Sequence, residues 1–209
     1  VQEFLPFNKV ELHGKAPGSS KDVLIFSSTL EEDGKFEFLN VPELASAFIR
    51  ILLEHKDSKV VRVRGQVLKG SSTPVNLPNF KIKAGLTVSF DQPVAPALFT
   101  GKTGSIDFGD FEALQPRFAM YCDAYKSVWF GHTKLLELTE GTADAPLCII
   151  NVPQPTDSTS FVQSGEMFLL ESDVQDIDVI LHEYGHFVGE KFVGGLGSLG
   201  YTFNDEPEP

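Results

Sequence analysis

The chain has 209 residues, a length that allows one large or two small domains. Of these residues 42% are hydrophobic and 22% are charged, which is typical of a globular protein and not of a disordered chain. Its formal net charge of −12 argues against nucleic acid as a partner, because phosphate binding needs clustered Lys and Arg. No apolar run approaches the roughly 20 residues that a membrane-spanning helix needs, so we expect no membrane span.

The first ninety residues have the pattern of β-structure. Short runs rich in Val, Ile, Phe and Leu predict strands at 9–12, 22–26, 35–39, 47–55 and 59–68. Asp33-Gly34 suits a tight turn before the third run, where Phe36 and Phe38 alternate with charged residues and predict one buried face. Short strands separated by turn residues predict a small β-sandwich over residues 1–90.

The segment EEDGKFEFLNVP, residues 31–42, resembles a hairpin of transthyretin-like or carboxypeptidase-regulatory-like β-sandwich domains. The resemblance implies a structural or binding appendage of an enzyme. Turn formers are frequent between residues 70 and 105, so we place the domain boundary there, with 81–90 as a last strand or a linker strand. Gly101-Lys102-Thr103 lacks the full spacing of a phosphate loop and is interpreted as a surface loop.

The second part of the chain, residues 91–209, predicts a helix, two strands and a second helix. Pro116 suits the first turn of a helix that ends near Gly131, and 146–152 and 165–171 are candidate strands. The apolar stripe of the first helix is Phe118, Tyr121, Cys122, Tyr125, Val128 and Trp129.

The second helix is expected to follow Ser172, which forms a capping box with Gln175. Its end is predicted at Gly189 or at Gly194-Gly195. Its apolar stripe is Val174, Ile177, Ile180, Leu181, Tyr184 and Val188.

This second helix carries the sequence His182-Glu183-Tyr184-Gly185-His186. Residues four apart lie on one side of a helix, so the two imidazoles can bind one Zn²⁺. Glu183 would lie beside the metal and act as the general base toward the attacking water. Gly185 leaves room near the metal, although glycine costs about 1 kcal/mol in a helix interior. The alternative is a surface helix with two solvated histidines.

VILHEYGHFVG, residues 179–189, resembles the active-site helix of zincin metallopeptidases, in which an edge strand holds the peptide substrate by β-augmentation. The resemblance covers roughly residues 106–192. It implies a zinc-dependent endopeptidase with His182 and His186 as zinc ligands, Glu183 as the catalytic residue and a peptide or protein as substrate. The predicted fold class is α+β, an N-terminal small β-sandwich followed by the N-terminal half of a zincin-like α/β catalytic domain.

The third zinc ligand is not evident. In metzincins a histidine follows six residues after the second one, and Phe192 occupies that position here. In gluzincins the third ligand is a glutamate on a later helix. Glu206 follows His186 but is flanked by Pro207, and Glu190 lies one turn after His186. We therefore expect a chain truncated before its third ligand, with weak zinc binding and poor hydrolysis.

Cys122 and Cys148 are either paired in a disulfide or two separate buried thiols. The zincin likeness and such a bridge together imply secretion. Among the other histidines, His132 is interpreted as a partner of the first helix's C-terminal dipole, and His13 and His55 as surface residues.

Two rival functions remain open. One is a binding or adhesion protein in which the β-sandwich works and the zincin half is a catalytically inactive scaffold. The other is a metalloprotein that is not a peptidase. The sequence leaves the cleavage specificity, the oligomeric state and the biological role undetermined.

Overall fold

The computed structural model describes residues 7–31, 34–57, 60–66, 76–77, 80–82, 85–95, 116–141, 146–153 and 159–193. Its strands are β1 (Asn8–Lys15), β2 (Val23–Thr29), β3 (Ser46–His55), β4 (Val61–Gly65), β5 (Asn76–Leu77), β6 (Phe80–Lys81), β7 (Ser89–Val94), β8 (Cys148–Val152), β9 (Phe161–Gln163) and β10 (Glu166–Phe168). Its helices are α2 (Pro116–Leu138) and α3 (Ile177–Val193). The fold is thus mixed α+β, which confirms the predicted class at this level.

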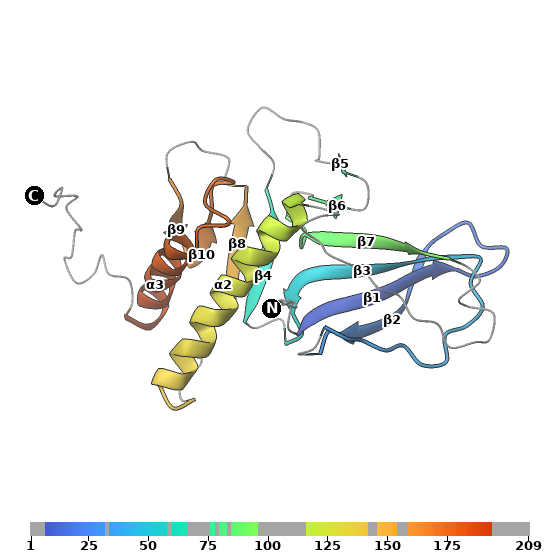
Figure 1. Cartoon of the computed structure of the whole chain (residues 1–209), viewed down its shortest axis with the longest axis horizontal. Coiled ribbons are helices and arrows are strands. Elements are labelled where there is room, and N and C mark those ends of the chain that lie inside the picture. Colours follow the sequence, from blue (N-terminus) through green and yellow to red (C-terminus); the bar gives the residue numbers. More distant parts are fainter. Residues whose placement is uncertain are drawn as a thin grey trace, which may run out of the picture.

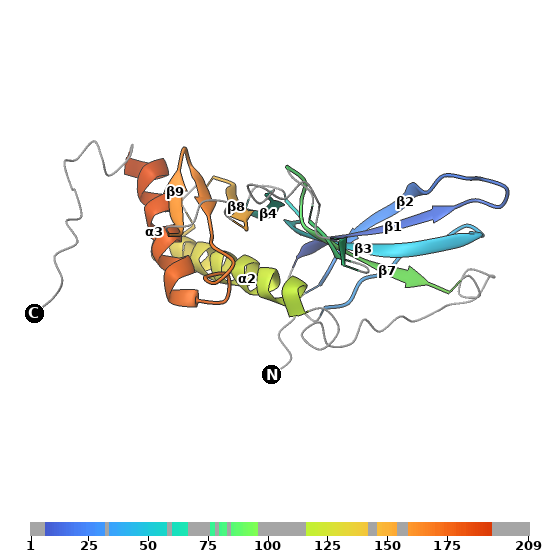
Figure 2. The same ribbon diagram turned by 90° about the horizontal axis from the view of Figure 1, so that it is seen from above.

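One end of the molecule is an antiparallel sheet with the strand order β2-β1-β3-β7-β6-β5. Alternate residues of β1 and β3 are buried, as expected for strands with one face on a core. The inward row includes Val10 and Leu12 of β1 and Ile49 and Ile51 of β3. Most of this sheet extends away from the two helices in both views of the ribbon (Figures 1 and 2), while the Phe90 ring of β7 lies 5.4 Å from that of Phe118 on α2, measured between centroids. Within the described ranges these strands form one sheet, so the predicted sandwich arrangement stays a prediction.

The other end continues the sheet in the order β4-β8-β10-β9 and is called the helix-covered sheet; it joins the antiparallel sheet where Glu54 of β3 pairs with Arg62 of β4. β4, β8 and β10 are parallel to one another, and β9 is antiparallel to β10. Val63, Ile150 and Met167 align across three strands and are fully buried. Helix α2 packs on β4 and β8, α3 packs on β9 and β10, and the two helices contact each other (Figure 1). One face of this sheet therefore forms the core beneath the helices.

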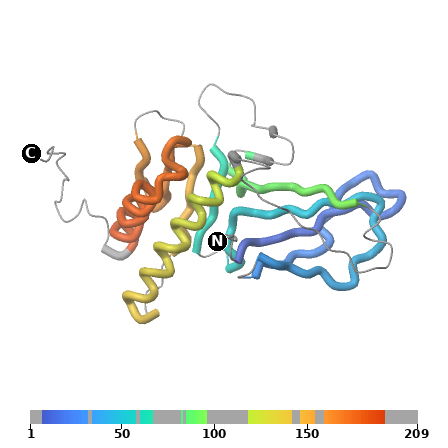
Figure 3. Tube along the Cα trace, viewed as in Figure 1, coloured from blue at the N-terminus to red at the C-terminus, as the bar shows by residue number. Residues whose placement is uncertain are grey.

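The path of the chain crosses between the two ends (Figure 3). β4 pairs in parallel with β8, from Val61 opposite Cys148 to Gly65 opposite Val152, and so lies with the helices. β5, β6 and β7 come after β4 in sequence and lie in the antiparallel sheet, with β7 beside β3. The expected division into residues 1–90 and 91–209 stays a prediction, and these pairings show that hydrogen bonding crosses it.

The prediction that residues 35–39 form a strand is wrong, but the predicted burial of Phe36 and Phe38 is confirmed. Residues 35–39 belong to no ladder, yet Phe36 and Phe38 are half-buried while Lys35 and Glu37 are exposed. The Phe38 ring lies 5.5 Å from that of Phe36 and 6.3 Å from that of Phe26 on β2, measured between centroids. The segment is held by aromatic packing and not by a sheet ladder.

Two other boundaries differ from their predictions. The predicted strand 81–90 is divided into β6 and β7, with Gly85 between them at φ 74°. Helix α2 begins at Pro116 as expected but continues through Gly131 to Leu138. Gly131 serves the packing of α2 on α3, and Gly141, with φ 74°, follows the true end of the helix.

The two cysteines are free and buried, so the disulfide alternative is wrong. Burial raises the pKa of both thiols. The Sγ of Cys148 instead lies 3.3 Å from the Sδ of Met167 in the core. No helix in the described part of the chain has both the length and the apolar character to cross a membrane. The Gly101-Lys102-Thr103 loop lies outside the described residues.

Candidate metal centre

Helix α3 begins at Ile177 because Asp176 caps it. The Oδ1 of Asp176 accepts hydrogen bonds from the backbone N–H groups of Asp178 (3.1 Å) and Val179 (3.3 Å). These are two of the amides that a helix leaves without an internal partner, and Asp is among the preferred residues for this position.

The predicted capping box of Ser172 and Gln175 is therefore wrong. Residues 171–175 form turns, held by backbone bonds from Asp173 N to Leu170 O and from Asp176 N to Asp173 O, both 3.0 Å. The helix starts one turn later than the pattern predicted and ends at Val193, so Gly189 lies inside it.

One side of α3 is buried against the sheet and α2. Ile180, Tyr184 and Phe187 form this side, and Ile177, predicted to belong to it, is 49% exposed because it is the first residue of the helix. The opposite side carries His182, which is exposed, and His186, which is half-buried. The sequence thus orients the two histidines away from the core, as their helical spacing predicts.

The two imidazoles converge. Their Nε2 atoms are 3.0 Å apart, their ring centroids are 4.6 Å apart, and the ring planes cross at 84°. A tetrahedral zinc ion with Zn–N bonds of 2.0–2.1 Å separates two ligand nitrogens by about 3.3 Å. Small rotations about the side-chain bonds would supply the difference, so the pair fits two positions of a zinc site.

Glu183 lies between the histidines in sequence but is only 7% exposed. Burial raises the pKa of its carboxyl, and the negative charge of Asp173 acts in the same direction, while the two histidines oppose the shift. A carboxylate with a raised pKa and limited contact with water has the properties of a general base.

Gly185 has no structural reason to be glycine. It is exposed, and a β-carbon at this position would meet no atom within 4 Å. Its backbone is helical, where alanine is more favourable by about 1 kcal/mol. That Gly185 leaves room near a metal stays a prediction.

The described residues contain no group of three or more His, Cys, Asp or Glu side chains that could hold a metal ion. Glu190 lies on α3 and does not complete such a group. Phe192 lies on α3, but the structure does not describe its side chain, and Glu206 lies outside the described residues. The described part of the chain thus brings together two imidazoles and a neighbouring carboxylate.

A buried network that the sequence did not indicate joins the edge strand β9 to the start of α3. The hydroxyl of Ser160, directly before β9, donates to Oδ2 of Asp173 (2.6 Å) and accepts from the backbone N–H of Leu170 (3.0 Å). Asp173 is the carboxylate whose charge acts on Glu183. No sequence motif indicates this role of Asp173, because its partner Ser160 is brought to it only by the fold.

The remaining histidines correct two predictions. His55 is buried and not at the surface, and His132 is buried within α2 and not at its C-terminus. His13 is half-buried and stacks on Phe48 with centroids 5.0 Å apart and planes 6° from parallel.

Comparison of the chain with protein-family models, with curated proteins and with solved structures finds no match.

Proposed function

We propose that this chain is the metal-binding part of a zinc-dependent endopeptidase. The observation that carries the proposal is the 3.0 Å separation between Nε2 of His182 and Nε2 of His186, which lie opposite the buried side of α3. Two imidazoles in this arrangement form a bidentate site without any change in the backbone. The zincin-like sequence around them supports the same function.

The two histidines and Glu183 would have different roles in hydrolysis. His182 and His186 would hold the zinc ion through their Nε2 atoms. A zinc ion bound there would act as a Lewis acid toward a water molecule and a peptide carbonyl. Glu183 would take the proton of the attacking water on a carboxylate oxygen and deliver it to the nitrogen of the leaving amine. Burial raises the pKa of the Glu183 carboxyl, which makes its carboxylate a stronger proton acceptor.

A peptide substrate would lie along β9. This strand ends the strand order, pairs with β10 on one side and packs beside α3. A free strand edge can bind an extended peptide through main-chain hydrogen bonds, which suits an enzyme that acts within a polypeptide. Secretion stays a proposal from the zincin likeness alone, since the cysteines are unpaired.

The alternative is a catalytically inactive zincin-like scaffold whose antiparallel sheet serves as a binding or adhesion module. The lack of a three-ligand group among the described residues favours this alternative. A site with only two imidazoles binds zinc weakly and holds a substrate carbonyl poorly.

Zinc titration of the full chain by calorimetry tests the proposal. We expect one zinc ion per chain, with binding lost in His182→Ala and in His186→Ala and retained in His13→Ala, the matched control on β1. Glu183→Gln should retain zinc and lose hydrolysis of a mixed peptide library. A chain that binds no zinc, or binds it equally after His182→Ala, would contradict the metal site. Zinc binding without hydrolysis by the unmodified chain would support the scaffold alternative.

A further inference from the structure

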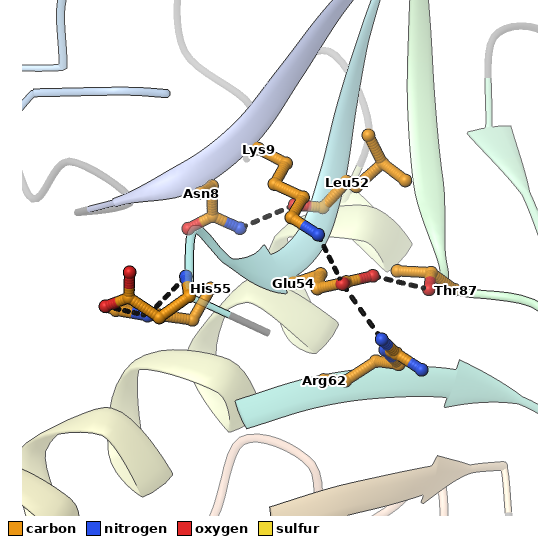
Figure 4. A network of polar contacts seen from close by, with 8 residues as sticks. Asn8, Lys9, Leu52, Glu54, His55, Arg62 and Thr87 are labelled. Atoms are coloured by element: carbon orange, nitrogen blue, oxygen red, sulfur yellow. Dashed lines mark hydrogen bonds and ion pairs between the residues drawn. The ribbon is translucent and has the colours of Figure 1, made fainter. Parts of the chain in front are cut away.

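The end of β3 is the junction at which the antiparallel sheet meets the helix-covered sheet and α2. On one side, the buried carboxylate of Glu54 accepts from Lys9 Nζ (2.7 Å), Arg62 (2.9 Å) and Thr87 Oγ1 (3.2 Å), as Figure 4 shows. These groups come from β1, β4 and the segment before β7, so they tie the two sheets together. Lys9 and Arg62 compensate the charge of the Glu54 carboxylate, so this carboxylate is stable in its ionised form.

The next residue, His55, projects to the other side of the strand and is also buried. Its Nδ1 accepts the backbone N–H of Asp57 at 3.3 Å. The Phe7 ring meets the imidazole edge-on, with centroids 5.8 Å apart, and lies 6.1 Å from the indole of Trp129 on α2. Phe7 thus connects the end of β3 with the middle of α2.

Helix α2 carries a second buried imidazole, that of His132, three residues after Trp129, and its charge acts on His55. Burial lowers the pKa of both His55 and His132, and a protonated His132 lowers that of His55 further. The other charges that act on His55 are Lys56, which opposes its protonation, and Asp57, which favours it.

The nearby charges of α2 do not neutralise the pair. Lys134 and Glu137 bind each other at the surface, 2.7 Å apart. Lys56 places its ammonium over the Phe7 ring, 4.4 Å from the centroid, and so adds a cation beside the imidazoles. Asp57 is the carboxylate whose charge favours protonation of His55, and it lies 3.6 Å from Nδ1 of His55 and is largely exposed.

We propose that His55 and His132 form a proton-sensitive junction, at which acidification separates the end of β3 from α2. Two buried imidazoles that both gain a proton repel each other, and each imidazolium is more stable when hydrated. Opening of the contact reduces the repulsion and lets water reach both rings. The residue before His132 on α2 is Gly131, which packs on Tyr184 of α3. Movement of α2 at the junction would therefore reach the helix that carries His182 and His186.

The single tryptophan of the chain, Trp129, reports this junction directly. The fluorescence emission of the metal-free full chain would be followed from about pH 7.5 to pH 5, with far-UV circular dichroism recorded on the same samples. We expect a red shift with a midpoint below the ordinary histidine pKa of 6.5 and no loss of helical signal. The variants are His55→Gln, His132→Gln and both together, with His13→Gln as the matched control.

The proposal requires that His132→Gln reduce the shift, that the double variant lose most of it, and that His13→Gln keep it. His132→Gln leaves the sequence of β3 unaltered, so this variant still tests the proposal if changes at position 55 impair folding. An emission spectrum that is constant with pH, a shift that survives in the double variant, or a parallel loss of circular dichroism would overturn the proposal. None of these outcomes depends on zinc binding.

Discussion

Gly131 of α2 lies directly against the ring of Tyr184 of α3. A β-carbon at position 131 would stand 2.8 Å from Cδ1 of Tyr184 and 3.2 Å from Cδ2 of Leu181. Tyr184 is buried and lies between the two candidate zinc ligands in sequence. The contact therefore determines how closely α2 approaches the helix that carries the candidate site.

Gly131→Ala should destabilise the protein by about 1–3 kcal/mol, because the added methyl group overlaps the Tyr184 ring and outweighs the gain in helix propensity. Urea unfolding followed by circular dichroism measures the change. Gly185→Ala is the matched control on the facing helix. It should stabilise the protein by about 1 kcal/mol, because nothing lies within 4 Å of its β-carbon position. Equal effects of the two variants would contradict the packing described here.

The start of α3 can be tested by two alanine substitutions. Asp176→Ala should lower the free energy of unfolding by about 1 kcal/mol through loss of the N-cap. Ser172→Ala should change it by less than about 0.5 kcal/mol, because Ser172 is exposed and caps no helix. The opposite ranking in thermal or urea unfolding would restore the capping box predicted from the sequence.

Ser160→Ala should destabilise the protein by about 1–3 kcal/mol, since it leaves the N–H of Leu170 and the carboxylate of Asp173 without their buried partner. Amide hydrogen exchange should show faster exchange at Leu170 and along β9. Ser172→Ala, which removes the other hydroxyl that contacts Asp173, is the control and should leave the Leu170 amide protected. Unchanged exchange at Leu170 in Ser160→Ala would refute this role.

Glu183 should make the metal-free protein less stable as pH rises. Its pKa in the folded protein is raised above 4.5, chiefly by burial, so the folded state binds the proton more tightly than the unfolded state. The stability that this provides is present below pH 4.5 and is lost as pH rises through the folded-state pKa. Glu183→Gln removes the titration, so its stability relative to the unmodified chain should increase from pH 4 to pH 7 in the presence of a chelator. A difference that stays constant over this range would show that the carboxyl is not desolvated.

Local sequence patterns determined the direction of side chains along single elements. The spacing of His182 and His186 placed both on one side of a helix, and the alternation around Phe36 and Phe38 indicated the right burial even where no strand forms. Both follow from the geometry of one segment, because a helix repeats every 3.6 residues and an extended chain every two. The α+β class follows from the same patterns.

Only the tertiary structure decided which segments meet. β4 pairs along its whole length with the distant strand β8 and meets β3 at Glu54 opposite Arg62, and Arg64 of β4 donates to Asn151 across a separation of 87 residues. His55 is buried because Phe7 and α2 cover it, and Gly131 lies inside a helix because Tyr184 packs there. Contacts of this kind depend on the free energy of packing between distant segments, which no local period in the sequence contains.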